Sequence, residues 1–210
     1  MAKRADHNER REIFAAAALR VIMRAGVAGL TVREVAKEAG FTTGALTHYF
    51  TSKDQVLIEA SEYSAKLMRP RMERMAREPS AVVALRKVVA EAMPLNQRSR
   101  DLWRIWLGFW ERSSYNPEVA RVMRARYEEW RGRIATLILR AQREGEAPVG
   151  FDADLAAQEL VALVDGIAVQ VVLGTGRIPA ARQREMVDTW IESMIAGRAG
   201  RDAGRQSKAG

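Results

Sequence analysis

The sequence predicts an all-α protein of about nine helices. Apolar residues recur at intervals of three and four along most of the 210-residue chain, and no convincing apolar–polar alternation indicates a strand. Most of the six prolines fall where one helical pattern stops and another starts. A chain of this length can bury a core without cross-links, and its lack of cysteine excludes disulfides and thiolate zinc sites. The predicted helices span residues 6–25, 32–39, 43–49, 53–77, 80–93, 97–114, 117–145, 152–174 and 179–196.

The start of the chain carries clear helix-end signals. The first helix ends at Gly26, and Thr31 has the residue type and position of an N-cap for the second. Glu34 follows three residues later and completes a capping box. Gly40 suits the left-handed position that ends a helix. These signals bound the short helix 32–39.

The third helix begins after only two more residues, Phe41 and Thr42. Two short helices joined by a tight, glycine-containing turn predict a helix-turn-helix, a motif whose second helix enters the DNA major groove. The residues of that helix that face away from its apolar side are small and polar, so the backbone can approach base edges. They are Thr43, Gly44, Thr47 and His48.

Lys53 lies in the first turn of the fourth helix, after a second capping box formed by Ser52 and Gln55. The helix dipole disfavours a cation there by about 0.3–1 kcal/mol. A phosphate bound at this end reverses the penalty, because the backbone N–H groups and the ammonium then address one anion. We therefore expect Lys53 to contact phosphate, the alternative being that it only extends into water.

The last two helices, 152–174 and 179–196, carry long apolar stripes. Both stripes could pack in the core of one protomer, or one face of each helix could meet a symmetry mate. Helix 152–174 is apolar around most of its circumference, which favours burial on two sides and a two-fold dimer. The candidate interface residues are Leu160, Leu163, Gly166, Ile167, Val171, Val187, Trp190, Ile191 and Met194.

Aromatic residues gather in the middle of the chain. Trp103, Trp106 and Trp110 share one face of helix 97–114. Such a stripe can simply be core, but aromatic faces also suit cationic ligands and methionine adapts to varied shapes. The hypothesis is an effector cavity for an apolar or cationic small molecule. Its candidate lining is Tyr63, Met68, Met72, Trp103, Trp106, Phe109, Trp110, Tyr127, Trp130 and Gln170.

The net charge of +8 is concentrated at the two ends of the chain. Residues 1–53 carry +4, residues 54–195 carry +1 and residues 196–210 carry +3. A basic head and a basic tail around a neutral body indicate a polyanionic partner such as double-stranded DNA. Solvated surface is the plainer alternative, and a non-specific basic DNA-binding or architectural protein is another. The Gly- and Ala-rich segment 197–210 is predicted to be disordered.

Catalysis finds little support in the sequence. The chain has two histidines and no phosphate-binding loop, and Gly174–Gly176 fails as a dinucleotide loop because no strand precedes it. Asp152 and Asp154 are explained by helix capping, whereas Asp165 in an apolar helix indicates a polar pocket or interface group. We expect no enzyme activity, no cofactor and no metal. We also expect no membrane span and, because the polar start lacks a signal sequence, a cytoplasmic protein.

Residues 9–60 resemble the DNA-binding domain of the TetR family of bacterial transcriptional repressors. The resemblance rests on three runs: Leu30-Thr31-Val32-Arg33-Glu34-Val35-Ala36, then Ala39-Gly40-Phe41-Thr42-Thr43-Gly44-Ala45-Leu46, then His48-Tyr49-Phe50 and Ser52-Lys53-Asp54. It implies a homodimer that binds a palindromic operator and releases it when a small molecule binds the C-terminal domain. It also implies a set of DNA-binding residues: Arg33, Thr42, Thr43, Gly44, Ala45, Thr47, His48, Tyr49 and Lys53. Of these, Tyr49 and Lys53 match the usual phosphate-contacting pair, and Thr47 departs from the tyrosine of many members.

The C-terminal block resembles the family more loosely. The run from Trp103 to Trp110, followed by Asn116-Pro117-Glu118, is similar to the choline-responsive branch that contains the betaine-pathway repressor. This resemblance does not imply that the present chain binds the same ligand, because effector pockets diverge on a shared scaffold. The expected domains are a helix-turn-helix domain (1–52), a helical effector-binding and dimerisation domain (53–196) and the basic tail (197–210).

Overall fold

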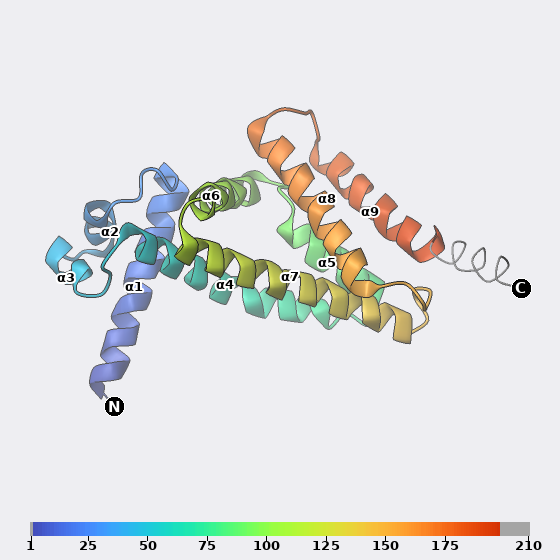
Figure 1. Ribbon diagram of the computed structural model, residues 1–210, viewed down its shortest axis with the longest axis horizontal. Helices are drawn as coiled ribbons and strands as arrows, with labels where there is room; N and C mark the ends of the chain where they lie inside the picture. The colour runs from blue at the N-terminus through green and yellow to red at the C-terminus, as the bar shows by residue number, and fades with distance from the viewer. Residues whose placement is uncertain (1, 198–210) are drawn as a thin grey trace, which may run out of the picture. The chain divides into compact units, whose positions relative to one another are not determined.

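The computed structural model describes the chain from residue 2 to residue 197, and this part consists of nine α-helices with no strand (Figure 1). The all-α prediction is therefore confirmed. The helices are α1 (Ala2–Ala25), α2 (Val32–Ala39), α3 (Thr43–Thr47), α4 (Lys53–Ala76), α5 (Ala81–Ala92), α6 (Gln97–Ser113), α7 (Pro117–Arg143), α8 (Ala153–Leu173) and α9 (Ala180–Gly197). Three ends differ from expectation by two residues or more, since α1 starts at Ala2 instead of residue 6, α3 stops at Thr47 instead of residue 49 and α7 stops at Arg143 instead of residue 145. Of the predicted tail, residues 198–210 lie outside the described residues.

The predicted helix ends at the start of the chain are present. The Glu34 N–H donates to Thr31 Oγ1 at 3.1 Å, and the Gln55 N–H donates to Ser52 Oγ at 3.1 Å. Gly40 ends α2 with a φ of 76°, a left-handed conformation that glycine adopts without a steric penalty. Local sequence therefore determines where α2 and α4 begin and where α2 ends.

The chain forms two compact units. The first consists of the residues up to Arg71 and of Arg104–Arg124. Phe14 lies at its centre, fully buried, with its ring 5.2 Å from that of Phe41 and 6.2 Å from that of Phe50. Edge-on aromatic packing of this kind adds to the stabilisation from burial. The helix-turn-helix belongs to this unit, and these rings pack it against α1.

Among the described residues, the second unit consists of Met72–Trp103 and of the chain from Ala125 to Gly197. In Figure 1, α8 and α9 run side by side within it, in agreement with their contacts. Its core is aliphatic. The largest fully buried side chains are Leu85, Met93, Ile134, Ile138, Leu160 and Ile167.

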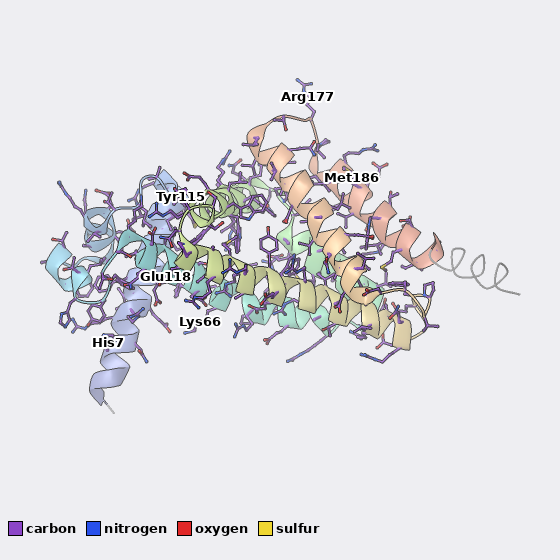
Figure 2. The ribbon with its side chains drawn as sticks, viewed as in Figure 1. His7, Lys66, Tyr115, Glu118, Arg177 and Met186 are labelled. Atoms are coloured by element: carbon purple, nitrogen blue, oxygen red, sulfur yellow. The ribbon has the colours of Figure 1, made fainter. Side chains whose placement is uncertain are left out.

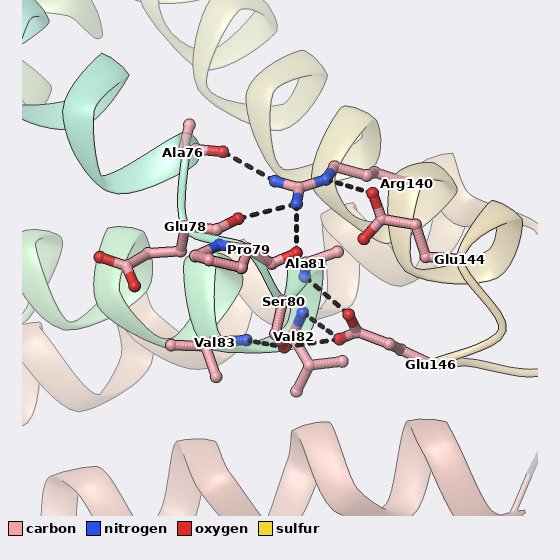
Figure 3. Close-up of polar contacts among 10 residues, drawn as sticks. All are labelled: Ala76, Glu78, Pro79, Ser80, Ala81, Val82, Val83, Arg140, Glu144 and Glu146. Atoms are coloured by element: carbon pink, nitrogen blue, oxygen red, sulfur yellow. Dashed lines mark hydrogen bonds and ion pairs between the residues drawn. The ribbon is translucent and has the colours of Figure 1, made fainter.

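Within the second unit, Arg140 of α7 holds the end of α4 (Figure 3). Its guanidinium donates to the carbonyl oxygens of Ala76, Glu78 and Pro79 at 2.9, 2.7 and 2.7 Å. The Ala76 carbonyl belongs to the last residue of α4, where the carbonyl groups have no partner within the helix and a cation complements the dipole, while Glu78 and Pro79 lie in the turn before α5.

Glu146, just beyond α7, holds the beginning of α5 in the same way (Figure 3). Its carboxylate accepts hydrogen bonds from Ser80 Oγ at 2.7 Å and from the N–H groups of Ala81 and Val82 at 3.0 and 2.9 Å. The Ser80 hydroxyl and these N–H groups lower the pKa of Glu146. Arg140 and Glu146 together tie the turn between α4 and α5 to the end of α7.

Among the described residues, one helix, α8, is long enough and apolar enough to cross a membrane, judged by length and composition alone. This is weak evidence, because the core helix of a globular protein passes the same test. Leu160, Val164 and Ile167 on α8 are buried in the second unit. Over the apolar window of α8 as a whole, 39% is buried.

Candidate nucleic-acid interface

The third helix presents a small polar face. Leu46 is fully buried and Ala45 is half-buried, so these residues dock α3 on the first unit. Thr43, Gly44, Thr47 and His48 are exposed, as the spacing predicts. A Cβ atom added to Gly44 would come no closer than 3.9 Å to any other side chain, the nearest atom being Thr42 Oγ1. Internal packing therefore does not require glycine at this position.

The three threonines of this region differ in what their hydroxyl groups contact. Thr42 is the N-cap of α3, and its Oγ1 accepts from the Ala45 N–H at 3.2 Å. Thr47 Oγ1 donates to the Gly44 carbonyl at 3.1 Å. Thr43 has no hydrogen-bond partner among the described residues, so its hydroxyl is available as both donor and acceptor.

Two basic side chains flank α3. Arg33 on α2 is exposed, and within the described part of the chain no carboxylate pairs with it. Lys53, the first residue of α4, is exposed and donates from Nζ to the Ala28 carbonyl at 3.4 Å. This contact is long for a charge-assisted hydrogen bond, so a phosphate oxygen can replace it. Both cations can therefore neutralise phosphate without losing a strong internal partner.

Tyr49 follows α3 and lies among other rings. Its centroid is 4.7 Å from that of His7, 5.5 Å from that of Phe14 and 5.9 Å from that of His48. Phe14 is buried whereas both histidines are exposed, and Tyr49 itself is half-buried. The ring of Tyr49 is thus supported from inside the unit and borders the exposed surface.

A hydrogen-bonded network fixes the first turn of α4 beside Lys53. Arg112 at the end of α6 grips the Asp54 carboxylate in bidentate fashion, with Nε to Oδ1 at 2.6 Å and Nη2 to Oδ2 at 2.5 Å. Asn116 Nδ2 adds a bond to Asp54 Oδ2 at 2.7 Å, while its Oδ1 accepts from backbone N–H groups at the start of α7. The Arg112 guanidinium lowers the pKa of Asp54. Three helices of the first unit therefore meet at one carboxylate.

A second contact joins α6 to the helix-turn-helix region. A Cβ atom placed on Gly108 would lie 2.6 Å from Val27 Cγ2 and 2.8 Å from Val27 Cβ. Only glycine at this position lets α6 approach the turn between α1 and α2 so closely. That turn also holds Ala28, the carbonyl partner of Lys53.

The ten residues predicted to line an effector cavity are distributed over both units. Tyr63, Met68, Trp106, Phe109 and Trp110 belong to the first unit, and Met72, Trp103, Tyr127, Trp130 and Gln170 to the second. In the first, the rings of Trp106 and Phe109 lie 6.0 Å apart. In the second, Trp103 Nε1 donates to the Ala92 carbonyl at 2.6 Å, whereas Gln170 is exposed and donates to the Gly166 carbonyl at 3.2 Å.

Asp165 is the polar exception on the apolar helix α8. Its carboxylate accepts a hydrogen bond from Tyr127 Oη at 2.9 Å, and among the described residues no cation pairs with it. Burial raises the pKa of Asp165 to about 6, although the tyrosine hydrogen bond opposes the rise. The sequence predicts a polar pocket or interface group here, and the geometry adds Tyr127 as its partner.

The residues predicted to form a dimer interface differ in exposure. Leu160, Ile167, Val187, Ile191 and Met194 are buried within the protomer. The other four remain accessible to a partner: Gly166 is exposed, and Leu163, Val171 and Trp190 are half-buried. Two more apolar side chains of α8, Leu155 and Leu173, are 48% and 62% exposed.

Sequence reasoning missed the ring contact of His7 and the network around Asp54. The spacing of seven residues between His7 and Phe14 could have indicated that both share a face of α1. No sequence signal pairs Arg112 with Asp54, because the two are 58 positions apart. Among the described residues, no group of three His, Asp or Glu side chains could hold a metal ion.

Comparison with known families matches two parts of the chain. The family described as "Bacterial regulatory proteins, tetR family" matches residues 14–60. The family described as "BetI-type transcriptional repressor, C-terminal" matches residues 81–196. The first match contains the helix-turn-helix and the second contains most of the remaining helices.

Individual relatives match over nearly their whole length. The chain is 28% identical over 195 residues to the HTH-type transcriptional regulator PksA of Bacillus subtilis, covering 92% of this chain and 94% of that one. It is 28% identical over 200 residues to the HTH-type transcriptional regulator BetI of Stenotrophomonas maltophilia, covering 93% and 97%. Among solved structures, a putative transcriptional regulator from Saccharomonospora viridis in complex with choline is 29% identical, with a TM-score of 0.79 and coverage of 90% and 98%.

Proposed function

Because this chain belongs to the TetR family of bacterial regulatory proteins, we propose that it represses transcription by binding a palindromic operator as a homodimer and releasing it when a small molecule binds. The chain is a helix-turn-helix transcriptional regulator with a BetI-type C-terminal region, and not an enzyme. This favours a sequence-specific regulator over a non-specific DNA-coating protein. As a regulator of bacterial transcription, it would act in the cytoplasm, where the chromosome lies.

The observation that carries the proposal is the exposed face of α3. Thr43 offers a hydroxyl and a methyl group with no partner among the described residues, which suits a base edge and a thymine methyl group. Gly44 allows the duplex to approach the backbone of α3 closely. Arg33 precedes α3 in the chain and Lys53 follows it. Both are proposed phosphate contacts, which position the protein on the duplex but carry no sequence information.

The homodimer is supported by the apolar side chains that α8 leaves uncovered in a single protomer. Leu155 and Leu173 are exposed near its two ends, and Gly166 between them has no side chain, so a second helix can approach closely. A two-fold axis through this face would pair α8 and α9 of two copies into a four-helix interface. It would also present two α3 helices to half-sites one helical turn or a multiple of it apart, about 34 Å per turn.

Coupling between ligand and DNA is proposed to run through α6 and α4. Helix α6 carries Trp106 and Phe109, and it meets the DNA-binding region through Gly108 on Val27 and through Arg112 on Asp54. A ligand that displaces α6 would therefore move the turn that holds Ala28, the carbonyl partner of Lys53, and would also move Asp54, the residue after Lys53. Ligand and operator then oppose each other by one coupling free energy, typically about 1–3 kcal/mol.

The proposed effector is apolar or cationic. The choline complex of the Saccharomonospora viridis regulator supports a cation, and so does the carboxylate of Asp165, which has an aromatic hydroxyl as its partner and no cation beside it within the described chain. Titrating choline and its neutral isostere 3,3-dimethylbutan-1-ol against tryptophan fluorescence compares the two classes. A preference for choline that Asp165→Asn abolishes supports a cationic effector, and equal binding of both compounds supports an apolar one.

The test of function is selection of bound duplexes from a random DNA pool. A specific regulator enriches one palindromic sequence and binds it about 10³-fold or more tightly than a random duplex. Thr43→Ala should relax the base preference, whereas Lys53→Ala should weaken binding to all duplexes about equally. Enrichment of no sequence, with similar affinity for all duplexes, would refute the proposal.

A further inference from the structure

Thr47 belongs to the exposed face of α3, but its hydroxyl group is engaged within the helix. Its Oγ1 donates to the Gly44 carbonyl oxygen at 3.1 Å. A threonine hydroxyl has one proton, so the only donor of this side chain is already used. Because the residue is exposed, it still offers a partner its methyl group and the free acceptor capacity of Oγ1.

The two threonines that precede it offer different groups. Thr42 Oγ1 caps α3 by accepting from the Ala45 N–H at 3.2 Å. Thr43 lies one turn before Thr47 on the same exposed face and has no hydrogen-bond partner among the described residues. Its hydroxyl can therefore both donate and accept. Along this face, a fully polar reading group at position 43 is followed one turn later by a methyl group whose hydroxyl neighbour can no longer donate.

The end of α3 is held from inside the first unit. Leu46, the residue before Thr47, is fully buried. The ring of Tyr49 contacts the rings of Phe14 and His7 (labelled in Figure 2), with centroids 5.5 and 4.7 Å apart. The backbone at Thr47 is therefore fixed between a buried side chain and a packed ring, and a group so fixed can discriminate between similar partners.

We propose that Thr47 recognises the 5-methyl group of a pyrimidine, so that each operator half-site carries a thymine in contact with it. This inference rests on the proposed function, because it names the chemical group that one residue of the α3 face recognises. The C5-methyl of thymine is the one methyl group that the four bases present in the major groove. Gly44, on the same face, adds no side chain that would hold this base away.

The occupied hydroxyl also disfavours guanine at this position. Guanine presents only acceptors in the major groove, its N7 and O6. With its proton on the Gly44 carbonyl, Thr47 has no donor for either of them. Cytosine presents an amino group that Oγ1 can accept from, but it lacks the methyl group. A 5-methyl group on cytosine should therefore replace that of thymine.

The test measures affinity for the palindrome enriched by selection, with each thymine of the half-site replaced in turn by uracil, which lacks only the methyl group. Thr47→Ser keeps the hydroxyl and removes the methyl, whereas Thr47→Val keeps a methyl and removes the hydroxyl. The matched control is Thr136→Ser in α7, because Thr136 is exposed and its Oγ1 likewise donates to a backbone carbonyl, that of Gly132, at 2.8 Å. Thermal unfolding checks that each variant is folded.

Burying one methyl group changes a binding constant by about fourfold, so removing it from both half-sites of a symmetric operator should weaken wild-type binding by roughly fifteenfold. Thr47→Ser should lose a similar factor on the thymine operator and should not respond to uracil at the contacted position. Thr47→Val should still respond, and Thr136→Ser should behave as wild type. With cytosine at that position, 5-methylation should restore wild-type affinity by the same factor and leave that of Thr47→Ser unchanged.

The inference is overturned if the enriched half-site lacks thymine, or if no uracil replacement affects wild type and Thr47→Ser differently. It is also overturned if Thr47→Val abolishes the response to uracil while Thr47→Ser keeps it, since the hydroxyl would then be the reading group. In each of these cases the enriched palindrome leaves the proposed function standing. A wild-type protein that enriches no palindrome overturns both.

Discussion

Replacing Gly108 by alanine tests the close approach of α6 to the turn between α1 and α2. The added methyl carbon would lie 2.6 and 2.8 Å from two carbons of Val27, about 1 Å inside the 3.5–4.0 Å optimum for such contacts. Val27 is β-branched and has few other rotamers, so the backbone must move. Overpacking of this kind costs about 1–3 kcal/mol, whereas glycine to alanine within a helix gains about 1 kcal/mol.

The steric term should win, and Gly108→Ala should lower the free energy of unfolding by up to about 2 kcal/mol. For a chain of this length, that corresponds to a fall in Tm of up to roughly 8 °C. The matched control is Gly132→Ala in α7, where the added Cβ meets nothing within 4 Å. It should instead raise the free energy of unfolding by about 0.5–1 kcal/mol.

Urea and thermal unfolding followed by circular dichroism measure both variants, together with Val27→Ala and Gly108→Ala/Val27→Ala. Removing the Val27 branches makes room for the methyl group, so the double variant should be more stable than the sum of the single changes by about 1 kcal/mol or more. If Gly108→Ala stabilises the protein as Gly132→Ala does, or the double variant is simply additive, α6 does not press on Val27 and the steric argument fails.

Three further predictions concern charged side chains. Arg112→Ala should leave Asp54 without its bidentate partner. An effector typically lowers operator affinity by about 5–150-fold, and in this variant the effector should lower it little or not at all. An undiminished effect in binding titrations would contradict the proposed coupling. Asp165 has a pKa raised to about 6, so the folded state binds its proton more tightly than the unfolded state and stability falls as pH rises from about 4 to about 6. Asp165→Asn should therefore be more stable than wild type at pH 8 by up to about 3 kcal/mol, with a difference that closes near pH 4; urea unfolding at both pH values would reveal a constant difference if the reasoning is wrong. Glu146 has a lowered pKa, so the stability it contributes is present above its ordinary pKa and is lost in acid. Glu146→Gln should cost about 1–2 kcal/mol at pH 7 and little near pH 3, and an equal loss at both pH values would exclude the carboxylate charge as the cause.

Much of the DNA-binding region could be read from local sequence. The N-caps at Thr31 and Ser52 and the glycine at position 40 act within a few residues of their own position, so residue type alone predicts where α2 and α4 begin and where α2 ends. The exposed face of α3 followed from helical spacing for the same reason. The beginning of α1 was harder, because its first turn has no strong cap, and its contact with Tyr49 joins residues that are distant in the chain.

The larger C-terminal region was less accessible to sequence reasoning. Spacing placed Leu160 and Gly166 alike on candidate interface stripes, yet the first is buried within the protomer and the second is exposed. Helical periodicity identifies the apolar residues of a nearly all-apolar helix, but it cannot say which neighbour covers each of them. The dimer face and the effector cavity therefore stay predictions.

The sequence by itself determined the helices, their caps and the polar face of α3, because these depend on interactions within one or two turns. The tertiary structure decided what the side chains do there. Within the described chain, it left the Thr43 hydroxyl free while Thr42 and Thr47 bond to the backbone of α3. It also joined Arg112 to Asp54 across 58 positions of sequence. Such contacts depend on how distant helices pack, and that information is spread over the whole core instead of any one segment.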